Sequence, residues 1–178
     1  MRILYSIVLF FVLSSLSAQD TTSLFMRDWG EYLNHDLFIG YNGSPTENSD
    51  LRSNYHGIEL GIWRSKFINY RHPASGSVYF SQELGINTGN LIHGTKIGGQ
   101  VAAMMFILGL ELTHHTDYES HSATISPLIG IGGYTFRLSF AWRLRLTSKD
   151  FLPLSPLNVN LSFKFLRLKS KKISSYPY

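Results

Sequence analysis

Charged side chains lie within segments of this sequence that are otherwise strongly apolar. The run 134–146, YTFRLSFAWRLRL, places Arg137, Arg143 and Arg145 among large apolar residues. An ion that is removed from water costs several kcal/mol unless an opposite charge accompanies it. Arginines held beside carboxylates in such a place could form a structural network, line a narrow ion path or serve acid–base chemistry. The direction in which these side chains point therefore decides what they can do.

A second chemically suggestive group lies in residues 114–121, HHTDYESH. If this stretch is extended, His115, Asp117, Glu119 and His121 share one face. Histidine and carboxylate suit zinc or a similar ion. The spacing matches no specific ligand pattern, however, and an ordinary solvated loop has the same composition. We therefore predict no metal and no cofactor, and keep these four residues only as the metal candidates of second choice.

The composition excludes several classes of protein. The 178 residues include no cysteine, which rules out disulfides and thiolate metal sites. Nucleophile elbows, phosphate loops and nucleic-acid motifs are absent from the sequence. The net charge is +4, and the charged residues are scattered along the chain apart from a basic group at 167–172. We expect neither an enzyme nor a nucleic-acid partner.

The first 18 residues have the layout of a secretory signal peptide. Arg2 precedes an apolar stretch over residues 3–13 that only Ser6 interrupts, and small residues follow, ending at Ala18. This apolar stretch is short for a membrane-spanning helix. We predict cleavage after Ala18 and export of the chain, with a retained anchor as the alternative.

Alternation of apolar with polar or small residues runs through the rest of the chain. In residues 56–65, Ile58, Leu60 and Ile62 share one face and Glu59 lies on the other. Successive side chains of a strand point to opposite faces, so this pattern predicts strands. Six clear strands are expected at 56–65, 77–87, 105–113, 123–132, 134–146 and 157–165, and two weaker ones at 36–43 and 92–101. The even number depends on dividing residues 92–115 into a hairpin.

These strands predict an all-β fold, a closed antiparallel up-and-down eight-stranded transmembrane β-barrel. The apolar faces are nearly free of charge and suit lipid, whereas the opposite faces mix glycine, serine and charge, which suits a narrow lumen. A closed barrel also pairs every backbone group, as lipid demands. The expected organisation is a signal peptide at 1–18, a periplasmic lead-in at 19–35, the barrel at 36–168 and a basic tail at 169–178. The alternative is a soluble exported ligand-binding barrel with its faces reversed.

On this prediction the charged residues point into the barrel and must pair there. We expect an interior charge network that plugs the lumen and fixes strand register, with Arg137 and Lys164 nearer the periplasmic end. A gate, a narrow ion path or catalytic carboxylates are the alternatives for the same residues. The members of this predicted charge network are Glu59, Glu83, Glu111, Arg137, Arg143, Arg145 and Lys164, and Lys96 lies on the same face.

The stretch KIGGQVAAMMFILGLELTHHTDYESHSATISPLIGIGGYTFRLSFAWRLRL resembles the central strands of small eight-stranded outer-membrane barrels of Gram-negative bacteria, the OmpA and OmpX type. The resemblance covers residues 36–168 and implies a fold and a location in the outer membrane. Lipid A deacylases on such barrels use a histidine and a serine that face lipid. Here the matching stretch 114–116 has no serine, although Ser120 and Ser122 follow.

We therefore expect a structural, adhesive or accessory-subunit role in the outer membrane. The expected partners are outer-membrane lipid and other outer-membrane proteins. A lipid A-modifying hydrolase, a narrow channel and the soluble exported barrel remain the alternative functions.

Overall fold

The computed structural model describes residues 30–44, 55–69, 71–86, 91–133, 135–147 and 155–175. These residues form strands joined by short connections, and none of them belongs to a helix that could cross a membrane. The predicted signal peptide at 1–18 lies outside the described residues, and so do residues 19–29 of the predicted lead-in. The strands are β1 (Gly30–Ser44), β2 (Tyr55–Asn69), β3 (Ala74–Gly85), β4 (His93–Ala103), β5 (Phe106–Thr116), β6 (His121–Gly132), β7 (Phe136–Trp142), β8 (Leu144–Arg145) and β9 (Leu157–Ser175).

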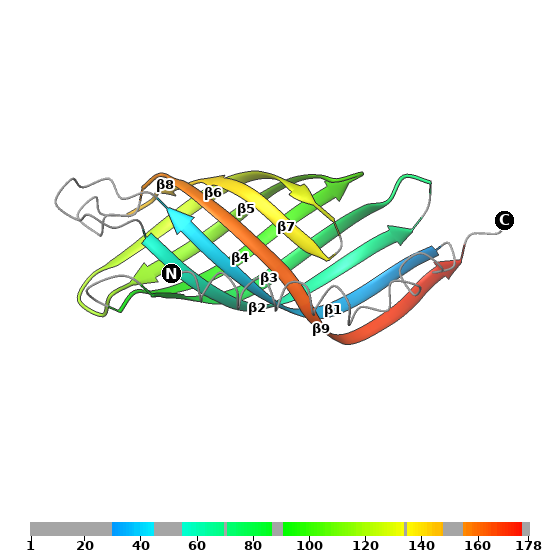
Figure 1. Ribbon diagram of the computed structural model, residues 1–178, viewed down its shortest axis with the longest axis horizontal. Helices are drawn as coiled ribbons and strands as arrows, with labels where there is room; N and C mark the ends of the chain where they lie inside the picture. Colours follow the sequence, from blue (N-terminus) through cyan, green and yellow to red (C-terminus); the bar gives the residue numbers. More distant parts are fainter. Residues whose placement is uncertain are drawn as a thin grey trace, which may run out of the picture.

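The strands close into one antiparallel barrel (Figure 1). Each strand from β1 to β6 pairs with the next, β7 joins β6 to β9, and β9 pairs with β1. Strands β7 and β8 both pair with β6 and form one wall strand that is interrupted at Arg143. The predicted closed eight-stranded up-and-down barrel is therefore confirmed. The predicted hairpin within 92–115 is formed by β4 and β5, which turn at Met104 and Met105.

The ends of the first and last strands correct the predicted boundaries. Strand β1 begins at Gly30 rather than at 36, and β9 continues to Ser175 rather than ending at 168. Part of the predicted lead-in and most of the predicted basic tail are thus strand. The two segments pair with each other across three irregularities in register, at Glu31/Tyr32, His35/Asp36 and Leu37/Phe38. In Figure 1 the blue β1 and the red end of β9 run side by side at the right of the view.

The barrel carries its apolar side chains outside. On β2, Ile58, Leu60 and Ile62 are about half exposed, whereas Glu59 between them is completely buried. This arrangement is the reverse of a protein that folds around an apolar core in water. The outward belt continues around the wall with one or more large apolar residues on every long strand, including Ile39, Phe80, Ile97, Leu110, Ile129, Phe140 and Phe165.

The lumen is filled by a few large side chains packed against small ones. Phe38, Trp63 and Tyr79 form an aromatic cluster in which Phe38 meets both other rings edge-on. Gly98 lies against the Tyr79 ring so closely that a side chain at that position would overlap it. Alternation of large and small residues is how a narrow barrel fills its interior. The lumen of the described barrel is therefore a packed core with polar groups in it.

Candidate functional site: the charged lumen

Lys96 of β4 is the centre of the charged lumen. Its ammonium group lies 3.2 Å from Glu59 Oε2 on β2 and 3.9 Å from Glu111 Oε1 on β5, and it forms a closer ion pair with Glu83 on β3. The lysine and all three carboxylates are almost completely buried. One cation thus joins acidic side chains from three strands. Removing any of these charged groups would leave a buried charge without its partner.

Neutral side chains donate further hydrogen bonds to two of these carboxylates. Glu59 accepts hydrogen bonds from Ser81 Oγ at 2.6 Å, from Asn42 Nδ2 at 2.8 Å and from Asn160 Nδ2 at 2.9 Å. Tyr79 donates its hydroxyl to Glu111 Oε2 at 2.8 Å. Hydrogen bonds to a charged acceptor are the stronger kind in a site that excludes water. The excess of carboxylates over Lys96 is offset in this way.

Glu83 differs from the other two carboxylates because an aromatic hydroxyl and a histidine lie beside it. Tyr55 donates a short hydrogen bond to Glu83 Oε1, and His115 Nε2 lies 3.8 Å from the same oxygen. His115 is completely buried, and neither of its ring nitrogens hydrogen-bonds to a described residue. Glu83 therefore contacts Lys96 on one side and, on the other, Tyr55 and His115, which lie where β2 begins and β5 ends.

Arg137 lies between the carboxylates and the aromatic cluster. Its guanidinium donates to Gln100 Oε1 at 3.1 Å, to Asn160 Oδ1 at 2.9 and 3.1 Å and to Ser162 Oγ at 3.3 Å. The guanidinium carbon also lies 4.7 Å from the centre of the Tyr79 ring and 5.3 Å from that of Trp63. These contacts hold a completely buried arginine with three hydrogen-bond acceptors and two aromatic faces.

A separate ion group lies toward the end at which β1 begins and β9 ends. Lys164 Nζ lies 3.2 Å from Asp36 Oδ2, donates to Ser65 Oγ at 2.9 Å and lies 4.8 Å from the Trp63 ring. Arg167, which is more exposed, contacts the other Asp36 oxygen at 3.3 Å. Because Asp36 belongs to β1 and both cations belong to β9, this group ties the first strand to the last.

Arg143 and Arg145 take less central positions. Arg143 is buried, and its guanidinium carbon lies 6.0 Å from the Tyr55 ring, but its two terminal nitrogens have no hydrogen-bond partner among the described residues. Its backbone N–H donates to Pro156 O at the break between β7 and β8. Arg145 is half-buried on β8 and lies opposite Thr124. Neither arginine forms an ion pair with Glu59, Glu83 or Glu111.

Comparison of the sequence with models of known protein families gives no match, and comparison with curated proteins gives none either. The geometry of the lumen and of the outer wall therefore carries the functional argument.

The candidate metal residues do not come together. Residues 117–120 form a tight turn in which Asp117 Oδ1 accepts hydrogen bonds from the N–H groups of Glu119 and Ser120. His115 points into the lumen, whereas His121 is exposed and packs beside His114. The shared face that the sequence suggested needs an extended chain, which the turn removes. Among the described residues no group of three potential ligands is placed to hold a metal.

The histidines near this turn also lack a serine partner. His114 and His121 face outward with their rings 6.0 Å apart, and no described serine donates a hydrogen bond to either ring. Ser122, which the sequence offered as a neighbour, is buried on the inward face. The outward histidine–serine pair of a lipid A deacylase is therefore not formed by the described residues.

The structure brings together Glu59, Glu83 and Glu111, and it places Arg137 beside them and Lys164 in the second group. No special place was predicted for Lys96 from the sequence, although this lysine contacts all three carboxylates. The neutral partners Asn42, Asn160 and Tyr55 were not predicted. Asp36 was missed because it stood at the very start of a weak predicted strand. The signal available was the inward parity that Lys96 and Tyr79 share with the carboxylates.

The described lumen holds four buried acidic side chains and four buried basic side chains. The buried acids are Asp36, Glu59, Glu83 and Glu111, and the buried bases are Lys96, Arg137, Arg143 and Lys164. Equal numbers of acidic and basic groups, with large aromatic rings among them, can favour one alignment of neighbouring strands and can narrow the path along the barrel. The arrangement can hold the barrel in one register and close its interior.

Arg143→Ala tests whether the lumen is closed by its charged side chains. We expect a rise in conductance in planar bilayers, because a buried side chain with no hydrogen-bond partner among the described residues is removed. Loss of its contact with Tyr55 should lower the free energy of unfolding by about 1 kcal/mol. Arg71→Ala, in the exposed turn between β2 and β3, is the matched control. If Arg143→Ala changed neither conductance nor stability, Arg143 would have no part in the network.

Proposed function

We propose that this protein is a small outer-membrane β-barrel of the OmpA and OmpX type, with a filled lumen and a structural, adhesive or accessory-subunit role. The observation that carries the proposal is the continuous outward belt of exposed apolar side chains around a closed barrel with a polar interior. Exposed apolar area of this extent is unfavourable in water and favourable against lipid chains. The signal-like sequence at 1–18 supports export from the cell interior.

The contents of the lumen favour a structural role over transport. Lys96, its three carboxylates, Arg137 and the aromatic cluster occupy the interior in close contact with one another. An ion path would need a continuous polar opening past these groups. A structural or accessory role requires only a stable barrel and a surface that partners can reach.

The extension of β9 supports an accessory role in particular. Residues 165–175 are exposed and include the basic residues Arg167, Lys169, Lys171 and Lys172. They pair with β1 at the end of the barrel where both strands meet. This positive surface suits contact with an acidic partner protein.

Gel mobility of the protein from the isolated outer-membrane fraction tests the proposal. We expect unheated protein to remain folded in detergent and to run at a different apparent mass from boiled protein. Recovery of the protein in the soluble periplasm, with no difference between the two samples, would contradict it. Co-purification of partners after mild detergent extraction would support an accessory subunit, whereas a change in the mass of lipid A in overexpressing cells would favour the hydrolase.

Leu60→Arg tests whether the outward belt faces lipid. Leu60 is 55% exposed and lies between Ile58 and Ile62 on β2, so an arginine there needs no repacking of the lumen. In a lipid-facing position the charge should cost about 2–4 kcal/mol of unfolding free energy near the bilayer midplane. Urea unfolding in lipid vesicles measures this cost, and Lys169→Arg on the exposed extension is the control. A stability equal to that of the parent protein would indicate that Leu60 faces water.

A further inference from the structure

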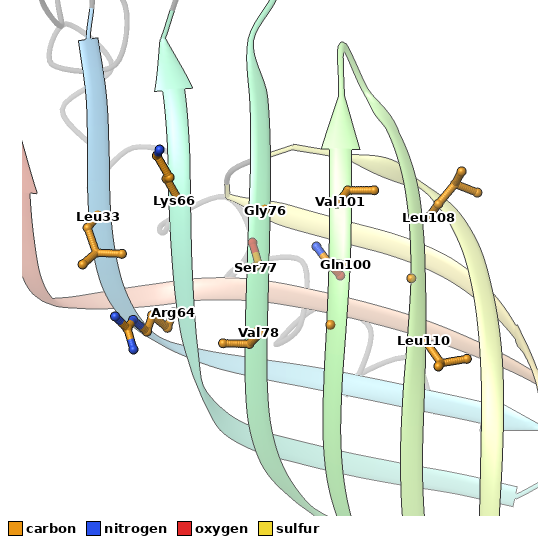
Figure 2. Close-up of a pocket in the computed structure, with 12 residues that line it drawn as sticks. Leu33, Arg64, Lys66, Gly76, Ser77, Val78, Gln100, Val101, Leu108 and Leu110 are labelled. Carbon is orange, nitrogen blue, oxygen red and sulfur yellow. The ribbon is translucent and has the colours of Figure 1, made fainter. Parts of the chain in front are cut away.

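The outer wall has a groove where two outward positions carry no side chain. Gly76 on β3 and Gly99 on β4 both point away from the lumen, and a Cβ atom at Gly76 would meet nothing within 4 Å. A Cβ at Gly99 would meet only the Ser77 carbonyl oxygen, at 3.8 Å. The resulting groove has a volume of about 740 Å³ and is open to the surroundings of the barrel (Figure 2).

Strand register gives this groove two different ends. The pairing across four strands sets out two rows on the outer wall, Lys66–Gly76–Val101–Leu108 and Arg64–Val78–Gly99–Leu110. Each row begins with a basic residue on β2 and finishes with a leucine on β5. Figure 2 shows Arg64 and Lys66 on one side and Leu108 and Leu110 on the other. Three strand spacings separate the two sides, or roughly 14 Å.

The basic end is not fully neutralised by the protein. Lys66 Nζ forms an ion pair with Glu31 Oε2 at 2.8 Å. Arg64 is exposed and has no ion pair or hydrogen bond from its side chain to a described residue. A guanidinium on a lipid-facing wall is costly unless it reaches the interface or meets an anion. Its planar fork of donors matches the geometry of a phosphate, which is the anionic group that every phospholipid carries. The groove thus has at its polar end one positive charge, that of Arg64, with no partner among the described residues.

We propose that the groove binds a phospholipid with a negatively charged headgroup. Its phosphate contacts Arg64, with Lys66 beside it, and one acyl chain lies over Gly76 and Gly99 toward Leu108 and Leu110. The glycines allow the chain to approach the backbone, and Val78 and Val101 flank it. This proposal rests on the membrane location proposed above and adds a specific lipid site to it.

Native mass spectrometry of the detergent-solubilised, folded protein tests the site. The probes are phosphatidylglycerol and phosphatidylcholine with the same acyl chains, offered in equal amounts. We expect the parent protein to retain phosphatidylglycerol preferentially. Gly76→Leu and Gly99→Leu fill the groove, and each should reduce retention of both lipids by about fivefold to tenfold. Arg64→Gln removes the contact with the phosphate that both lipids carry, so it should weaken retention of both. It should weaken phosphatidylglycerol more, because only that lipid has a net negative charge, and the preference should be largely lost.

Two matched controls separate the groove from general effects. Ala123→Leu adds bulk on the outward face of β6, and Lys169→Gln removes an exposed positive charge on β9, so neither should alter lipid retention. A folded barrel in the membrane fraction that binds both lipids equally, or whose glycine variants bind them as the parent does, would overturn the lipid site alone. Absence of the parent protein from the membrane fraction would overturn the proposed function and the lipid site together.

Discussion

Replacing Lys96 by methionine is expected to lower the free energy of unfolding by about 3–5 kcal/mol, the cost of leaving buried charges without their partner. Methionine keeps the length of the side chain, so packing changes little. The three buried carboxylates would then lose the ammonium group that they share, and the hydrogen bonds left to Glu59 and Glu111 come from neutral donors. Urea unfolding in detergent micelles, followed by gel mobility, measures the loss.

Two further variants make the Lys96 prediction specific. Lys169→Met makes the same chemical change on the exposed extension of β9 and should alter stability by no more than about 0.5 kcal/mol. Adding Glu83→Gln to Lys96→Met removes one of the uncompensated charges, so the double variant should be more stable than Lys96→Met alone. The central role assigned to Lys96 is wrong if Lys96→Met unfolds at the same urea concentration as the parent protein.

Gly61→Val is expected to prevent normal packing of the lumen, with a loss of about 3 kcal/mol in unfolding free energy or failure to form the folded barrel that unheated samples should contain. Gly61 points inward on β2. A Cβ atom there would lie 2.5 Å from the Phe80 carbonyl oxygen, 2.5 Å from Ser81 Cβ and 2.6 Å from the Phe38 ring. The Phe80 carbonyl oxygen and Ser81 Cβ are fixed to the backbone of β3, so the clash cannot be relieved by rotating one side chain.

Gly76→Val is the matched control for Gly61→Val. It makes the same substitution on the adjacent strand but on the outward face, where a Cβ atom meets open space. Because valine favours strands more than glycine does, this variant should be at least as stable as the parent. Thermal stability followed by gel mobility compares the two variants. Equal effects would mean that the inward and outward faces are not distinguished as described.

The two faces of the barrel could be predicted from sequence because a strand repeats every two residues. Within 134–146, inward Arg137 and outward Phe140 follow directly from parity, and the structure places them on those faces. Partners across the lumen could not be predicted in the same way. Glu59, Lys96 and Glu111 belong to strands that are not all adjacent, so their meeting depends on register and strand tilt together. Parity alone gives every inward charge equal weight.

The limits of β1 and β9 escaped prediction for a different reason. Each irregularity in their register places an extra residue on one strand, which interrupts the two-residue alternation. Residues 169–175 therefore read as part of a basic tail even though they are strand. The Asp36–Lys164 pair lies in this region, and it could have been anticipated only by pairing the first strand with the last.

The seam between β1 and β9 also determines when the barrel can be completed. Most wall strands of the described barrel pair with a neighbour in sequence, and such hairpins close short loops. The seam instead joins positions as distant as Asp36 and Arg167, which are 131 residues apart. Until residues 157–175 arrive, β1 has an unsatisfied edge, and contacts of such long range form slowly. An unpaired strand edge is a template for self-association, so the barrel carries this hazard until its last strand pairs with its first.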